Sequence, residues 1–110
     1  YGDGSQTRDF IHVTDVVNAN LLALDPRGGA GEAVNVGTGM ETSVRELHAI
    51  MTELIGKTDV IPTGRPQKAG EIRRSCADTN KAQTTLGFKA KVPLRSGLER
   101  LITAMRLRHL

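Results

Sequence analysis

The 110-residue sequence has no tryptophan, and its only aromatic side chains are Tyr1, Phe10 and Phe88. A hydrophobic core must therefore be aliphatic, and a nucleic-acid-binding surface built from several stacking aromatics is excluded. Long apolar runs are absent as well. None approaches the roughly 20 residues of a membrane span, and the first residues do not resemble a signal peptide. The sequence starts with Tyr rather than Met, so we expect an internal segment of a longer protein.

Cysteine occurs once, as Cys76. An intrachain disulfide and a zinc site built on cysteine pairs are therefore excluded, and we expect a reducing, cytoplasmic location. Cys76 lies between Ser75 and Ala77, where a buried and inert thiol is predicted. The histidines at positions 12, 48 and 109 are scattered and predict no metal site.

The sequence also lacks a long run of residues with the same charge. The sequence has 15 Lys+Arg and 12 Asp+Glu, a formal net charge of +3. Its densest basic stretches are Arg73-Arg74 and the tail with Arg106, Arg108 and His109. Neither reaches the roughly five to eight residues of a basic patch that binds nucleic acid. We therefore expect neither a nucleic acid nor a membrane as a partner.

What is present is an alternation of short strand and helix patterns. Strands are expected at residues 8–13, 33–36, 59–63 and 75–77. Helices are expected at residues 14–25, 43–55 and 78–86 and from about residue 93 onward. This order predicts an α/β fold, mixed α+β when the chain is isolated. The strands are too few and too short for a complete doubly wound sheet.

The helix ends carry specific signals. Thr14 is the expected N-cap of the first helix, with Asp15 in a capping role in its first turn and Pro26 and Gly28-Gly29 after its end. Ser43 and Glu46 fit a capping box, and Gly56 and Gly87 should end their helices. Asp78 should cap the third helix. The last helix is expected to bury Leu94, Leu98, Leu101, Ile102 and Met105.

Two patterns that suggest chemistry are weak. Gly37-x-Gly39-x-x-Thr42 partly matches a dinucleotide-binding loop but lacks its third glycine, so a tight turn is the better interpretation. His12 and Asp15 are close in sequence, but their spacing does not place them in contact. A Tyr-x-x-x-Lys pair and a nucleophile elbow are absent.

Four other residues stand in or beside glycine-rich segments. Arg8 offers a planar fork for phosphate oxygens, and Lys68 offers a point charge. Glu71 could accept two hydroxyl hydrogen bonds, and Tyr1 could stack on a base. The alternative is that Arg8 pairs with Asp9 or Asp15 and that loop 63–71 is only solvated. Residue types alone leave these two interpretations equal.

A resemblance favours the first interpretation. GDGSQTRDFIHVTDV (2–16), VNVGTGMETSVREL (34–47), KAGEIRRSCADTNKAQTTLGF (68–88) and PLRSGLERL (93–101) resemble, in order, blocks of the extended short-chain dehydrogenases that act on nucleotide sugars. These enzymes form the NAD-dependent epimerase/dehydratase family. Within it, RDFIHVTDV followed by VGTG looks most like the UDP-glucose 4-epimerases. The resemblance implies that residues 1–110 are the substrate-binding region of a Rossmann-type enzyme, including one strand of its sheet near 33–36.

The resemblance also implies residue roles. Tyr1 matches the aromatic residue against the uracil, and Arg8 matches the arginine that holds the diphosphate. Lys68 stands where the family usually has a second phosphate-binding arginine. Lysine keeps the positive charge but lacks the bidentate fork of arginine. Glu71 matches the acid that binds the ribose hydroxyls, and Ser75 borders the C2 substituent of the sugar.

The family's NAD-binding loop and catalytic Tyr-x-x-x-Lys precede this region. We therefore expect catalysis, NAD and a homodimer for the complete enzyme. For residues 1–110 alone, we expect no catalytic residue, no bound NAD, no activity and a tendency to self-associate. The open alternatives are an inactive nucleotide-binding or interaction module, a part of a sister nucleotide-sugar dehydratase and, last, a small basic nucleic-acid binder.

Overall fold

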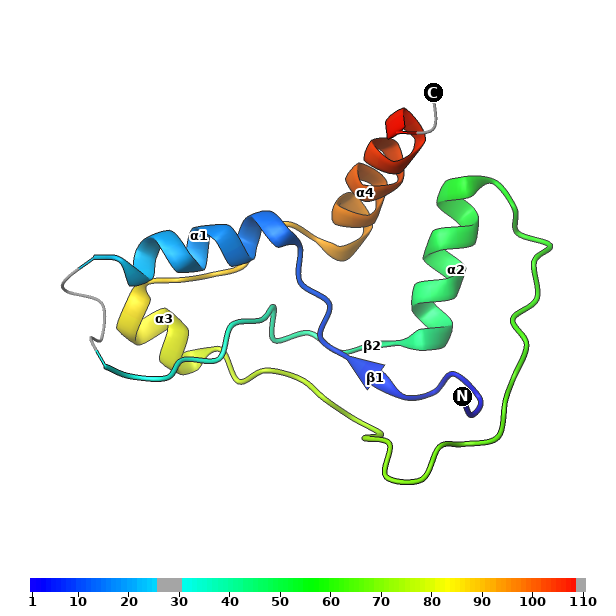
Figure 1. Cartoon of the computed structure of the whole chain (residues 1–110), viewed down its shortest axis with the longest axis horizontal. Coiled ribbons are helices and arrows are strands. Elements are labelled where there is room, and N and C mark those ends of the chain that lie inside the picture. Colours follow the sequence, from blue (N-terminus) through cyan, green and yellow to red (C-terminus); the bar gives the residue numbers. More distant parts are fainter. Residues whose placement is uncertain (26–30, 109–110) are drawn as a thin grey trace.

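The computed structural model describes residues 1–25 and 31–108, and Figure 1 shows the arrangement of its elements. The elements are β1 (Thr7–Arg8), α1 (Val13–Ala23), β2 (Thr42–Ser43), α2 (Val44–Ile55), α3 (Asn80–Leu86) and α4 (Leu94–Arg108). The predicted mixed α/β class is confirmed.

The short strand β1 is the centre of the molecule. It pairs with β2 in antiparallel orientation, Thr7 opposite Ser43 and Arg8 opposite Thr42. On its other side, the Thr7 amide donates to the Arg73 carbonyl at 2.9 Å, and the Ser75 amide donates to the Thr7 carbonyl at 3.2 Å. Three segments far apart in the sequence therefore meet at β1.

Most of the strand predictions are wrong. Only Arg8 of the predicted strand 8–13 lies in a strand, and residues 33–36, 59–63 and 75–77 belong to none. A strand requires a neighbour that completes its ladder, and the described segments offer one only to β1 and β2. Val34 and Val36 instead pack against the small core. Pairing of residues 33–36 with a larger sheet stays a prediction.

The helix signals are more reliable. Ser43 and Glu46 form the capping box, and Gly56 ends α2 at a φ of 83°. Gly87 ends α3 at a φ of 67°, and α4 starts directly after Pro93.

Two predicted N-caps are wrong. α1 is capped by His12, whose side chain accepts a hydrogen bond from the Thr14 amide, so Thr14 lies inside the helix. The N-cap of α3 is Thr79, although the Asp78 carboxylate accepts a hydrogen bond from the Asn80 amide at 3.0 Å. The predicted stop at Pro26 and Gly28-Gly29, like His109, lies outside the described residues.

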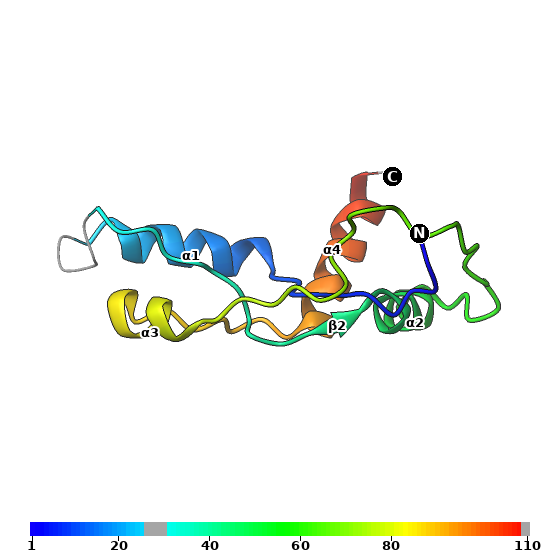
Figure 2. The same ribbon diagram turned by 90° about the horizontal axis from the view of Figure 1, so that it is seen from below.

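The buried core is small and lies where α1 packs beside α3. It consists of Ala19, Ala82 and Phe88. Figure 2 shows how thin the molecule is: its extents are 50 × 40 × 18 Å, and its radius of gyration is 16.6 Å. A compact domain of this size has a radius of about 13 Å. The accessible surface is 8220 Å², whereas a compact monomer of 11.9 kDa exposes about 5,900 Å².

The excess surface is partly apolar. Leu101 and Met105, predicted to be buried, are 51 % and 52 % exposed. The spacing of these residues does define one face of α4, but no other described segment covers its C-terminal half.

Candidate functional site

Arg8 and Glu71 are brought together where β1 ends. Arg8 Nη2 lies 3.8 Å from Glu71 Oε1, and Arg8 Nη1 donates to the Thr7 carbonyl at 2.6 Å. The alternative pairing of Arg8 with Asp9 or Asp15 is wrong, because both carboxylates accept hydrogen bonds elsewhere. Glu71 Oε2 is buried and has no hydrogen-bond partner among the described residues. Such an atom is destabilising unless a ligand or water donates to it.

Tyr1 and Lys68 form a second pair. Lys68 Nζ lies 5.6 Å from the centre of the Tyr1 ring, a cation–π distance. Tyr1 is 58 % exposed, so one member of this pair faces solvent. Tyr1 and Glu71 line the same small hollow, which links the two pairs. Ser75 is exposed beside β1.

Backbone contacts hold the first residues of the chain in place. The Gly2 amide donates to the Arg65 carbonyl at 2.7 Å, and the Arg45 amide at the start of α2 donates to the Gly4 carbonyl at 2.8 Å. Gly2 and Gly4 have φ values of 73° and 80°, which favour glycine. The tight Gly-Asp-Gly turn therefore holds Tyr1 beside loop 63–71.

Asp9 is the main structural residue that sequence reasoning missed. Its carboxylate accepts hydrogen bonds from the Thr38 amide and hydroxyl, the Gly39 amide and the Ala77 amide. Burial alone would raise the pKa of Asp9, but these hydrogen bonds outweigh it and hold the pKa below its usual value. A Cβ on Gly37 would lie 2.5 Å from Asp9 Oδ2, so only glycine fits there.

These contacts also bear on whether the Gly37–Gly39 segment can bind a dinucleotide. Gly39 has a φ of 77°, as the predicted tight turn requires. The Thr38 and Gly39 amides that could cradle a pyrophosphate already donate to a carboxylate. The segment therefore does not fit a dinucleotide phosphate.

Glu41 and Arg74 form another tie beside β1. Arg74 donates from Nε at 2.9 Å and from Nη2 at 2.7 Å to the two Glu41 oxygens, and the Thr7 hydroxyl donates to Glu41 at 2.9 Å. The hydrogen bonds from Arg74 and then Thr7 lower the pKa of Glu41 to about 2. The sequence gives no signal for this pair.

Asp15 and Cys76 differ from expectation. Asp15 is buried, and its carboxylate accepts from the Lys91 and Val92 amides at 3.0 and 3.1 Å instead of capping α1. As expected, His12 and Asp15 form no pair: His12 bonds the Thr14 hydroxyl. Cys76 is exposed, as is its neighbour Ser75, so the predicted buried thiol is wrong. Desolvation and the Asp9 charge raise the pKa of its thiol.

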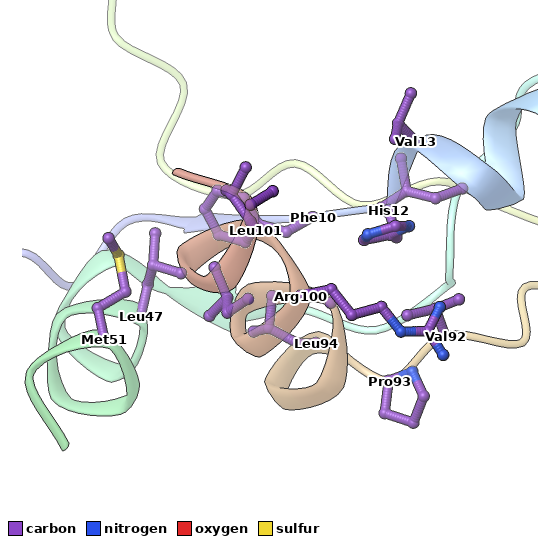
Figure 3. A pocket seen from close by; sticks show the side chains of 14 residues that line it. Phe10, His12, Val13, Leu47, Met51, Val92, Pro93, Leu94, Arg100 and Leu101 are labelled. Atoms are coloured by element: carbon purple, nitrogen blue, oxygen red, sulfur yellow. The ribbon is translucent and has the colours of Figure 1, made fainter. Parts of the chain in front are cut away.

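A separate hollow lies between the start of α1, α2 and α4 (Figure 3). We call it the α2–α4 groove. It has a volume of about 620 Å³ and is lined mainly by apolar side chains, among them Phe10, Leu47, Met51 and Leu94. Among the described residues that line it, the ionisable side chains are His12 and Arg100.

In the described ranges, 1–25 and 31–108, no three His, Cys, Asp or Glu side chains are grouped as a metal site. None of the helices described there is long and apolar enough to cross a membrane.

Comparison with known proteins identifies the class. The sequence profile of the family described as GDP-mannose 4,6 dehydratase matches residues 1–101. The chain belongs to this family, whose members are of the NAD-dependent epimerase/dehydratase type.

Its relatives specify the similarity further. The UDP-glucose 4-epimerase of Mycolicibacterium smegmatis and the putative UDP-glucose 4-epimerase of Methanocaldococcus jannaschii are each 42 % identical over 106 residues, covering 96 % of this chain and 33 % of the relative. The chain thus spans about a third of the length of these curated relatives.

Solved structures support the same assignment. The Thermotoga maritima UDP-glucose 4-epimerase, solved with UDP-glucose, superposes on this chain with a TM-score of 0.92 and 38 % identity. The superposition covers all of this chain and 35 % of the epimerase. MoeE5, solved with UDP-glucose and NAD, superposes with a TM-score of 0.90 and 39 % identity. That superposition covers all of this chain and 36 % of MoeE5. The fold is therefore that of part of a Rossmann-type nucleotide-sugar epimerase.

Proposed function

We propose that this chain is the substrate-binding part of an NAD-dependent nucleotide-sugar epimerase acting on UDP-glucose and UDP-galactose. One observation carries the proposal. Four residues expected to contact a UDP-sugar form two linked pairs, Arg8 with Glu71 and Tyr1 with Lys68.

Together these residues contact the base, the diphosphate, the ribose and the sugar. Tyr1 stacks on the uracil, while Arg8 and Lys68 neutralise the diphosphate. Glu71 Oε2, buried and without a partner, accepts hydrogen bonds from the ribose hydroxyls. Ser75 borders the C2 substituent of the sugar. The 3.8 Å Arg8–Glu71 pair is longer than a hydrogen bond, so it restrains both side chains without using all their hydrogen-bonding capacity.

The remainder of a longer protein supplies the reaction centre. NAD bound there would accept a hydride from sugar C4 and return it to the other face. Residues 1–110 contribute no catalytic residue and bind no NAD themselves. Their contribution is orientation, because a fixed nucleotide determines where C4 lies.

The same remainder covers the exposed apolar surface. We propose that it packs into the α2–α4 groove, while residues 33–36 add a strand to its sheet. The large surface of the isolated chain, and the relatives' greater length, support this arrangement. We also propose that the complete enzyme is a homodimer.

A second candidate is a sister enzyme acting on a GDP-sugar. The family description favours it, as does the 36 % identity to the probable GDP-L-fucose synthase 1 of rice (Oryza sativa).

Calorimetry on the full-length protein with UDP and with GDP separates the two. We expect tighter binding of UDP, together with conversion of UDP-galactose to UDP-glucose. Preferential GDP binding without this conversion would support the second candidate.

A further inference from the structure

We infer that Asp9 is a positioning residue for nucleotide-sugar binding: by tying together β1, the Gly37–Gly39 turn and Ala77, it fixes the spacing between Arg8 and Glu71. The inference rests on the proposed function. It assigns no contact with substrate to Asp9.

The first step is the geometry of neighbouring side chains. Successive side chains on extended backbone point to opposite sides. Arg8 contacts Glu71, whereas the Asp9 carboxylate contacts the turn residues Thr38 and Gly39. The carboxylate thus anchors the chain directly after β1 to a different segment from the one that Arg8 contacts.

The second step connects Asp9 to the segment that carries Glu71. The Ala77 amide donates to Asp9 Oδ2 at 3.3 Å. The same segment is tied to Thr7 through the Arg73 carbonyl and the Ser75 amide. Bonds at Thr7 and at Asp9 therefore set the register of residues 73–77 against β1, and Glu71 lies two residues before this segment.

The third step is that this anchor cannot adjust. Asp9 receives donors on both oxygens, the Thr38 hydroxyl on Oδ1 and the Gly39 and Ala77 amides on Oδ2. An asparagine offers one oxygen and one NH₂ group, so either orientation sets donor against donor. The turn is also packed tightly, because a Cβ on Gly37 would lie 2.6 Å from the Ala77 Cβ.

The test is Asp9→Asn in the full-length protein, with Asp15→Asn as the matched control. Asp15 is also a carboxylate that accepts two backbone amides, but it ties α1 to Lys91 and Val92, away from Arg8 and Glu71. Both variants should lower Tm. Only Asp9→Asn should raise KM for the nucleotide sugar and Kd for UDP, by about tenfold, with kcat changed less than about threefold.

Thr38→Val is a second variant in case Asp9→Asn fails to fold. It removes the hydroxyl donor and keeps the backbone amide, so a KM increase of roughly threefold is expected. An unchanged KM in folded Asp9→Asn overturns the inference. If Asp9→Asn does not fold, an unchanged KM in Thr38→Val overturns it. So does an equal KM increase in Asp15→Asn.

Arg8→Ala in the same assays tests the proposed function separately. If Arg8→Ala weakens UDP binding and Asp9→Asn does not, only the inference about Asp9 fails. If Arg8→Ala leaves UDP binding unchanged, Arg8 is a structural residue. If the unsubstituted full-length protein binds no UDP, the proposed function itself fails.

Discussion

Arg8 and Glu71, which come from opposite halves of the sequence, face each other with Nη2 and Oε1 3.8 Å apart. Both side chains are partly exposed, at 32 % and 23 %. Because a partly exposed pair contributes little to stability, we propose that its main effect is on ligand binding between these segments. In the proposed site, Arg8 would donate to phosphate oxygens and Glu71 would accept from ribose hydroxyls.

Arg8→Ala in the full-length protein should therefore impair binding more than folding. A charge-assisted contact contributes about 1.5–3 kcal/mol, so KM for the nucleotide sugar should rise roughly tenfold to a hundredfold while NAD affinity stays unchanged. Steady-state kinetics and calorimetry measure both. Arg95→Ala is the matched control, since Arg95 pairs with Glu53 between α4 and α2. Normal KM with reduced Tm in Arg8→Ala would make Arg8 a structural residue.

The isolated 110-residue chain should bind no NAD and catalyse no epimerisation. The sequence contains no Tyr-x-x-x-Lys pair, and the Gly37–Gly39 turn is engaged by Asp9. Calorimetric titration with NAD should give no saturable heat. A saturable signal would contradict the prediction and return the Gly37–Gly39 segment to consideration as a cofactor site.

The same isolated chain should self-associate or fold only loosely. Its accessible surface of 8220 Å² includes many exposed apolar side chains, and such surfaces associate. Light scattering across a concentration series should show rising mass. Leu101→Glu, inside the α2–α4 groove, should reduce self-association more than Leu107→Glu, because Leu107 does not line the groove. A compact monomer with a sharp unfolding transition is the contrary outcome.

Ser75→Tyr should change substrate choice. Serine leaves space beside the proposed C2 position, so the complete enzyme should accept N-acetylated UDP-hexosamines as well as UDP-galactose. Tyrosine bulk should lower kcat/KM for the N-acetylated substrates only, by steric exclusion. Equal loss for both substrate classes, or no loss for either, would remove Ser75 from the site.

Glu41 should contribute to acid sensitivity. Its pKa is about 2 in the folded state and about 4.5 without its partners, so the folded state binds fewer protons between these values. The stabilisation is present above pH 4.5 and is lost as the pH falls toward 2. Glu41→Gln in the full-length protein should flatten the decline of Tm across that range. An unchanged Tm-versus-pH curve would show that the Arg74 pair contributes no stability.

The sequence by itself determined the parts of this fold that depend on neighbouring residues. Ser43 and Glu46 form their capping box, and Gly56 and Gly87 end α2 and α3, because these signals act within a single turn of helix. The resemblance in the Arg8 and Glu71 segments also identified the family, since those motifs are linear in the sequence.

Only the tertiary structure decided which distant groups meet. Strand patterns at 33–36 and 59–63 could not reveal whether a pairing partner exists, because a ladder depends on a second segment. The sequence placed Asp9 and Asp15 near a strand end and a helix start. Their carboxylates instead hold Gly39 and Val92, because buried amides must find acceptors wherever the folded chain brings them.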